Sequence, residues 1–265
     1  MAISDFTFGI IGSGMLGRAM LRAILDRGGI PGDSVWVANR SGDLHGFEDH
    51  PDIHVTTEAW ELAGECDVIL LCVPPASVPA LQMSAPHALV VSVMAGITLD
   101  QLAQVSGSAR LIRAMSSPAA EAGLAYSPWV ASAEVTAEDK ARVTSLLSSC
   151  GETDELPTES QIDLFTAMTG PVPGFVAFFA ECMASYAVSR GVSPAIADRA
   201  TRQLFLAAGQ MMATGRARPE DHVQDMIDYA GTTAAGLTVL RRSGIASDLA
   251  DGLDAAVEKT RALGG

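Results

Sequence analysis

The chain has 265 residues, 48% of them hydrophobic, which is enough to bury a core in one large domain or two modest ones. Its formal net charge of -14 argues against nucleic acid or an anionic membrane surface as a partner, and no apolar run is long enough to span a bilayer. The four cysteines lack paired metal-ligand spacing, so we expect no metal site and a reducing, cytoplasmic setting.

A short apolar run at 6–11 ends in a glycine-rich turn that is followed by an amphipathic helical pattern. The turn consists of Gly12, Ser13, Gly14, Met15, Leu16 and Gly17. Gly12 allows a tight turn, Gly14 lets the backbone approach a pyrophosphate, and Gly17 lets helix and strand pack closely. The helix N-terminus adds free N–H groups and the positive end of a dipole. The flanking strand and helix favour a dinucleotide site over a structural turn in an unrelated α/β domain.

The second apolar run, at 34–38, is followed by Asn39, Arg40 and Ser41. A fold specific for NAD usually places a carboxylate here, about 20 residues beyond the glycines, to bind the ribose 2′-hydroxyl. A neutral amide and a guanidinium suit the 2′-phosphate of NADP instead, because arginine makes paired, charge-assisted hydrogen bonds to phosphate. We therefore expect Asn39 and Arg40 to bind NADP, with NADPH preferred over NADH. In the alternative, Arg40 only caps a surface turn.

Further apolar runs at 66–73, 88–94 and 110–115 alternate with helical patterns at 57–63, at 78–81 and from residue 99, where Thr98 can cap the helix. This β-α-β rhythm predicts a Rossmann-type α/β fold with a doubly wound, mostly parallel sheet. Ligands of such sheets lie at the carboxyl ends of the strands. The residues that this rule adds are Val73, Pro74, Ala95 and Gly96 for the cofactor and Ser117 for the substrate.

Beyond residue 155 the strand patterns give way to helical ones, at 161–190 with an interruption at 169–174, and at 194–214, 219–229, 233–242 and 245–262. We therefore expect an NADP-binding domain at 1–155 and an all-helical domain at 156–265 that binds substrate and dimerises. The helical part carries phenylalanines such as Phe175, Phe178 and Phe205, and is apolar enough to need a partner surface. A homodimer or higher homo-oligomer would supply that surface; the alternative is a helical cap folded back on its own sheet.

The chain resembles the pyrroline-5-carboxylate reductases along nearly its whole length. In the first half, GIIGSGMLGRAM resembles the family's cofactor loop, NRS its 2′-phosphate site, VPPASV its V-K-P-Q segment and SVMAGITLDQL its S-x-A-A-G-I-x-L stretch. In the second half, TGPVPGFVAFFAECM, AGTTAAGLTVLRRSGI and DGLDAAVEKTRAL resemble three helical segments. The second half is the more specific, because many dehydrogenases share the glycine loop.

The resemblance implies an NADPH-dependent enzyme that reduces a cyclic imine to L-proline and pairs through its second-domain helices, with the active site built between subunits. Substrate would lie against Ala230, Gly231, Thr232 and Thr233, where helix N–H groups suit a carboxylate and the threonine hydroxyls can bond to substrate or nicotinamide. The alternative for both threonines is simple helix capping.

The chain also departs from the family pattern near the substrate. Asp228 and Tyr229 stand where the family usually has Ser and Pro, Ala230 replaces a glycine, and Ser116-Ser117 and Pro74 replace Pro-Asn and Lys. Asp228 would repel a substrate carboxylate but could pair with a protonated iminium, and Tyr229 could supply a proton. A related imino acid is therefore an alternative to pyrroline-5-carboxylate as substrate.

Two other functions compete with an imine reductase. A 3-hydroxyacid-type dehydrogenase acting on C–O bonds also joins a nucleotide domain to helices, but typically relies on a lysine on the long second-domain helix. Residues 161–191 contain no lysine, which counts against that class. An NADP-binding sensor whose catalytic pocket has drifted is the other alternative.

Overall fold

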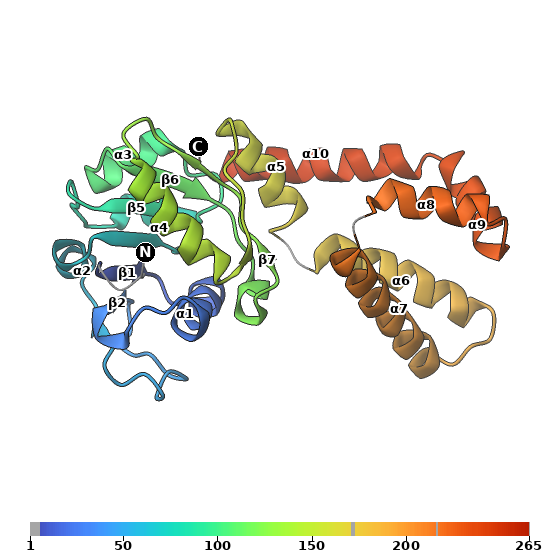
Figure 1. The fold of residues 1–265 in the computed structure, drawn as a ribbon, viewed down its shortest axis with the longest axis horizontal. Coiled ribbons are helices and arrows are strands. Elements are labelled where there is room, and N and C mark those ends of the chain that lie inside the picture. Colours follow the sequence, from blue (N-terminus) through green and yellow to red (C-terminus); the bar gives the residue numbers. More distant parts are fainter. Residues whose placement is uncertain (1–5, 171–172, 216, 265) are drawn as a thin grey trace. The chain divides into compact units, whose positions relative to one another are not determined.

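Figure 1 shows the fold in a computed structural model, which describes residues 6–170, 173–215 and 217–264. The chain forms two compact units, Met1–Pro171 with Leu253–Gly265, and Val172–Gly252. The functional boundary expected between residues 155 and 156 stays a prediction, because compactness alone assigns no ligand to either part.

Within the described residues of the first unit, seven strands form one sheet with the order β3-β2-β1-β4-β5-β6-β8. They are β1 (Phe8–Ile11), β2 (Val35–Ala38), β3 (His54–Thr56), β4 (Val68–Leu71), β5 (Leu89–Ser92), β6 (Leu111–Ala114) and β8 (Trp129–Ala131). Neighbouring strands are parallel except β6 and β8. β1 and β4 lie side by side, which is where a doubly wound sheet reverses its winding. The expected Rossmann-type class is confirmed.

Helices cover both faces of this sheet (Figure 1). α1 (Met15–Arg27) and α4 (Ala137–Ser148) pack on one face, and α2 (Ala59–Glu65) and α3 (Leu99–Ser106) on the other. Alternate side chains enter the two cores: Leu70 of β4 faces α1 and α4, while Ile69 and Leu71 face α2 and α3. Burial on both faces explains why the strand sequences are almost continuously apolar.

The first unit also contains elements that the sequence patterns did not reveal, among them β3, β8 and α4. β7 (Ala125–Tyr126) and β9 (Gly151–Glu152) form a small second sheet, and α5 (Ser160–Met168) follows. Short 3₁₀ helices lie at Gly32–Ser34, Pro75–Ala80 and Pro118–Ala122. The helix expected at 78–81 is the second of these, and Pro79 inside it has no N–H group to continue a longer helix.

The second unit is helical, with α6 (Gly174–Ser189), α7 (Pro194–Thr214), α8 (Pro219–Asp228) and α9 (Thr232–Arg241). α6 packs on α7 and α8 packs on α9, while α10 (Ile245–Leu263) begins in this unit and ends in the first. α6 buries none of its residues, and Phe178 on it is 59% exposed. The helices therefore leave apolar surface for a partner.

Candidate functional site

The glycine turn joins β1 to α1 with glycine required at two of its positions. Gly12 has a φ of +101°, and a Cβ added there would lie 2.5 Å from the Cys72 carbonyl oxygen. Gly17 packs so closely on Gly12 that a Cβ would collide with the Gly12 carbonyl oxygen. At Gly14, by contrast, an added Cβ would meet no described atom within 4 Å. The turn therefore has no room for a side chain at Gly12 or Gly17, whereas Gly14 leaves open space beside the backbone.

The first turn of α1 is a suitable place for phosphate. Gly14 is its N-cap residue, and no side chain caps the first turn, so the amide groups that start the helix lack a side-chain partner. Met15 is 78% exposed here, whereas Leu16 packs against the core. The structure therefore brings the residues expected at the cofactor loop together around an uncapped helix end, as pyrophosphate binding requires.

Asn39 links the end of β2 to this turn. Its Nδ2 donates hydrogen bonds to Oγ of Ser13 at 2.9 Å and to the carbonyl oxygen of Asp43 at 2.9 Å. Its Oδ1 accepts hydrogen bonds from the backbone N–H groups of Ser41 and Gly42, at 3.1 and 2.8 Å. Asn39 thus forms an Asx turn that shapes the loop after β2.

Arg40 is exposed beside Asn39. Its guanidinium makes no hydrogen bond or ion pair with any residue that the structure describes, and the turn is already stabilised by Asn39. Turn capping therefore does not explain Arg40. A free guanidinium next to the end of β2 is suited to a phosphate on the adenosine ribose.

The loop between β2 and β3 is fixed to α1. Phe47 is buried under two arginines, with the guanidinium carbon of Arg22 at 4.3 Å and that of Arg18 at 5.2 Å from the ring centroid. Arg22 Nη1 also lies 2.7 Å from Asp49 Oδ2, and this hydrogen bond raises the pKa of Arg22 and lowers that of Asp49. No motif or periodicity in the sequence indicates this packing, which holds the chain next to Arg40 in place.

The other expected cofactor residues follow β4 and β5. Val73 lies against the glycine turn, since a Cβ added to Gly12 would be 2.8 Å from Val73 Cγ1, and Pro74 is the N-cap residue of the adjoining 3₁₀ helix Pro75–Ala80. Ala95 and Gly96 follow β5, and Gly96 has a φ of +78°. Because parallel strands end at one edge of a sheet, these residues and the glycine turn share the edge where doubly wound sheets bind ligands.

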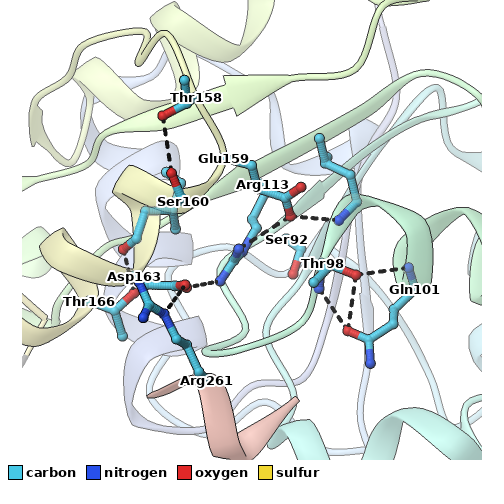
Figure 2. Close-up of polar contacts among 12 residues, drawn as sticks. Ser92, Thr98, Gln101, Arg113, Thr158, Glu159, Ser160, Asp163, Thr166 and Arg261 are labelled. Carbon is cyan, nitrogen blue, oxygen red and sulfur yellow. Dashed lines mark hydrogen bonds and ion pairs between the residues drawn. The ribbon is translucent and has the colours of Figure 1, made fainter. Parts of the chain in front are cut away.

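A cluster of charges around the buried pair Arg113 and Asp163 lies beside these strand ends (Figure 2). Arg113 of β6 is 3% exposed, and its Nη2 lies 2.5 Å from Asp163 Oδ1 and its Nη1 3.2 Å from Glu159 Oε1. Glu159 Oε1 also accepts a hydrogen bond from the Leu99 N–H at 2.9 Å, and Arg261 Nε lies 3.4 Å from Asp163 Oδ2. Sequence reasoning missed this cluster, because its members are far apart in the chain.

Ser117 is buried just after β6, at the start of the 3₁₀ helix Pro118–Ala122. Its hydroxyl has no hydrogen-bond partner among the described residues, whereas Ser116 Oγ lies 2.9 Å from Ser127 Oγ. Buried hydroxyls normally have a partner, so an unpaired one favours a ligand contact at Ser117.

The residues expected at the substrate, Ser117 apart, lie together between α8 and α9 in the second unit. Asp228 ends α8 and accepts a hydrogen bond from Gln224 Nε2 at 2.7 Å, and Tyr229 is 83% exposed. Ala230 has a φ of +57°, a left-handed conformation found at no other non-glycine residue that the structure describes. This backbone turns the chain into α9.

The two threonines stand at the start of α9. The N-cap residue is Gly231, and no side chain caps the helix, so neither Thr232 nor Thr233 does so. Both are exposed, and their hydroxyls make no hydrogen bond to another described residue. An uncapped helix end with two exposed hydroxyls can bind a carboxylate through N–H and O–H donors.

Among the described helices, none combines the length and the apolar character needed to cross a membrane. The described residues likewise contain no cluster of three or more His, Cys, Asp or Glu side chains that could hold a metal ion. Burial raises the pKa of Cys72 to about 12, so this thiol beside the glycine turn is neutral near pH 7.

Comparison with known proteins gives matches to both halves of the chain. Residues 7–96 match the family described as NADP oxidoreductase, coenzyme F420-dependent, and residues 159–263 match pyrroline-5-carboxylate reductase dimerisation. The pyrroline-5-carboxylate reductase of Escherichia coli is 30% identical over 263 residues, which cover 96% of this chain and 97% of that protein.

Solved structures have the same fold. A pyrroline-5-carboxylate reductase from Coxiella burnetii, 21% identical, aligns over 99% of this chain and 100% of its own with a TM-score of 0.85. A pyrroline carboxylate reductase from Plasmodium falciparum with NADP bound, 22% identical, aligns over 99% of both chains with a TM-score of 0.78. The likeness in fold therefore includes both the half with the parallel sheet and the helical half.

Proposed function

The chain belongs to the pyrroline-5-carboxylate reductase family, and on that basis we propose that it reduces pyrroline-5-carboxylate to L-proline with NADPH as the preferred donor. Membership makes it an NAD(P)H-dependent oxidoreductase that acts on a C=N bond. The observation that carries the choice of NADPH over NADH is the exposed Arg40 beside the Asn39 turn, where an NAD-specific fold has a carboxylate. Its guanidinium has no hydrogen-bond or ion-pair partner among the described residues.

The residues of the first unit fit this cofactor. The uncapped end of α1 and the open space at Gly14 suit the pyrophosphate, and Arg40 suits the 2′-phosphate. In a doubly wound sheet the dinucleotide crosses the switch point between β1 and β4, so the nicotinamide half belongs on the side of β4 and β5, near Val73, Pro74, Ala95 and Gly96. When bound, NADPH supplies the hydride for the imine carbon.

The chain's own residues then bind the substrate and deliver a proton. The N–H groups of α9 and the hydroxyls of Thr232 and Thr233 hold the carboxylate, while Ala230 and Gly231 form the close backbone. Tyr229 donates a proton through its exposed hydroxyl to the imine nitrogen, and Asp228 stabilises the iminium that results. In the first unit, Ser117 offers a buried hydroxyl for substrate binding, because this hydroxyl has no hydrogen-bond partner among the described residues.

The chain acts as a homodimer in this proposal. The match to a dimerisation domain covers the helices whose apolar side chains are exposed, including Phe178 on α6 and Leu206 on α7. Residues 1–155 bind the nucleotide, and residues 156–265 bind substrate and pair. We also place the enzyme in the cytoplasm, where the four cysteines, all free in the structure, stay reduced.

The direct test is NADPH oxidation with pyrroline-5-carboxylate, pyrroline-2-carboxylate and piperideine carboxylates in parallel. Rapid turnover of the first alone supports the proposal, and turnover only of the others assigns a related imino acid. Oxidation of NADPH with none of them, despite tight NADPH binding, identifies a sensor, and turnover of hydroxyacids with NADP identifies a C–O dehydrogenase.

Cofactor choice is tested with Arg40→Ala. Loss of charge-assisted hydrogen bonds worth about 1.5–3 kcal/mol should lower kcat/KM for NADPH by roughly 10- to 100-fold and leave NADH almost unchanged. Arg142→Ala is the matched control, because Arg142 pairs with Glu138 on α4 and should leave both values unaltered. If Arg40→Ala prefers NADPH as strongly as the wild type does, Arg40 does not bind the 2′-phosphate.

A further inference from the structure

The end of α10 lies directly on the loop that follows β5. A Cβ added to Gly96 would be 2.5 Å from the Thr260 carbonyl oxygen and 2.7 Å from the Gly264 nitrogen. A Cβ added to Gly264 would in turn collide with the Gly96 carbonyl oxygen. Two glycines far apart in the sequence thus meet backbone to backbone, and neither position has room for a side chain.

The side chain of Gln101 stabilises this contact between Gly96 and Gly264. Its Oε1 accepts a hydrogen bond from the Thr98 N–H at 2.8 Å, which completes the capping box at the start of α3 (Figure 2). Its Nε2 donates a hydrogen bond to the Gly264 carbonyl oxygen. One amide side chain therefore caps α3 with its oxygen and holds the end of α10 with its nitrogen.

Charged side chains also link the loop after β5 and the end of α10 to the first unit. Arg261, on the last turn of α10, pairs with Asp163 of α5, and Asp163 pairs with Arg113 of β6. Glu159 joins Arg113 to the Leu99 N–H, where the loop enters α3. The loop from Ala95 to Leu99 is consequently linked through Glu159 to Arg113 of β6, and it packs through Gly96 on the backbone at the end of α10.

We propose that the end of α10 is a positioning element for the nicotinamide half of the cofactor. It acts through Gly96 and through Gln101, a positioning residue that touches neither cofactor nor substrate. This inference rests on the proposed function, which places the nicotinamide beside the residues after β5. The held backbone of Ala95 and Gly96 then sets the depth at which the nicotinamide ring sits, and a small misplacement of a reacting group lowers turnover strongly.

Gln101→Glu tests the proposal because it separates the capping of α3 from the hydrogen bond to Gly264. Glutamate keeps an oxygen for the capping box but loses the donor to Gly264 and turns a carboxylate toward that carbonyl oxygen. Gln104→Glu is the matched control, since it adds the same charge on an exposed position of the same helix. Gly264→Ala is a second variant that adds one methyl group against Gly96, and Gly64→Ala, where an added Cβ meets nothing within 4 Å, is its control.

The readouts are kcat and KM for NADPH, thermal melting, and equilibrium binding of NADPH and of 2′-phospho-ADP-ribose, which lacks the nicotinamide. We expect Gln101→Glu and Gly264→Ala to lower kcat/KM by about tenfold or more while the fragment binds as in the wild type. Unchanged kinetics in both variants would overturn the proposal, and so would an equal loss of fragment binding, which would show a general disturbance of the sheet. A wild-type protein that binds no NADPH would instead refute the proposed function.

Discussion

Asn39 Nδ2 lies 2.9 Å from Ser13 Oγ, and this hydrogen bond ties the end of β2 to the glycine turn after β1. In the proposed function the two segments bind different parts of the cofactor, the 2′-phosphate and the pyrophosphate. Because one amide fixes both the turn after β2 and this link, the folded chain sets the distance between the two proposed phosphate sites before any ligand binds.

Asn39→Asp should convert the site from NADPH toward NADH. The carboxylate keeps the acceptor for the Ser41 and Gly42 N–H groups, but it repels a 2′-phosphate and can accept a hydrogen bond from a free ribose hydroxyl. We expect kcat/KM for NADPH to fall about tenfold or more while that for NADH holds or rises. Asn39→Ala, which loses the turn contacts without adding charge, should weaken both cofactors. A parallel fall for both in Asn39→Asp would show that the amide acts only through the fold.

Gly12→Ala should lower the stability of the protein, whereas Gly14→Ala should lower its affinity for NADPH. Gly12 has a φ of +101° and the Cys72 carbonyl oxygen against its missing Cβ, so alanine there should reduce the free energy of unfolding by about 1–3 kcal/mol. Gly14→Ala should leave the unfolding transition of the free protein unchanged and lower NADPH affinity about tenfold or more, because the methyl group occupies the space that the pyrophosphate needs. Denaturant titration and NADPH titration separate the two effects. Normal NADPH binding by Gly14→Ala would place the pyrophosphate elsewhere.

Asp163→Asn should destabilise the first unit strongly. It leaves Arg113 buried with only one of its carboxylate partners, and breaking a buried pair costs about 3–5 kcal/mol. Glu138→Gln is the control, since it breaks the exposed pair with Arg142 on α4, where about 0.5 kcal/mol is expected. Chemical denaturation followed by tryptophan fluorescence measures both. Equal losses in the two variants would mean that burial of the cluster adds nothing to stability.

Tyr229→Phe should lower kcat without a matching rise in KM. Removal of a general acid typically slows a reaction by about 10²–10⁴-fold. Asp228→Asn should weaken binding of the protonated imine and reduce the rate most at high pH, where free imine is unprotonated. Tyr126→Phe is the control, because its hydroxyl bonds to Asp154 in the first unit at 3.0 Å. If both Tyr229→Phe and Asp228→Asn turn over the true substrate at the wild-type rate, neither side chain takes part in catalysis.

The buried thiols should resist alkylation in the folded protein. Burial raises the pKa of Cys66 and Cys72 to about 12 and that of Cys150 to about 11, so almost no thiolate is present at roughly pH 8. The reactivity should rise as the pH approaches these values and should become uniform once the chain is unfolded. Timed alkylation with peptide mass analysis gives the rates. Fast native labelling of Cys72 at that pH would show that the sheet edge opens to solvent.

The central strands could be predicted because burial on both faces demands apolar runs, as at Val68–Leu71 and Leu89–Ser92. β3 could not be predicted because it is a short edge strand in which His54 is exposed. The ring centroids of His54 and Trp36 lie 4.7 Å apart, and the two rings stack. β8 could not be assigned from its own sequence, since its antiparallel pairing with β6 depends on tertiary context.

Some residues of the candidate site could likewise be predicted from the sequence, and others could not. Residues of the glycine turn and the Asn39 turn act through local backbone geometry, so spacing in the sequence reveals them. Arg113, Asp163 and Arg261 come together only after folding, and no periodicity or motif signals their contact. The left-handed backbone at Ala230 was equally hidden, because alanine rarely adopts it.

The return of α10 to the first unit has a consequence for synthesis on the ribosome. Leu253–Gly265 belongs to the same compact unit as Met1–Pro171, yet it is translated only after the whole of Val172–Gly252. The surface around Gly96 therefore stays uncovered in the nascent chain until the segment that contains Gly264 has been synthesised and can pack on it. A stalled or truncated product that lacks this segment would expose that surface to chaperones and proteases.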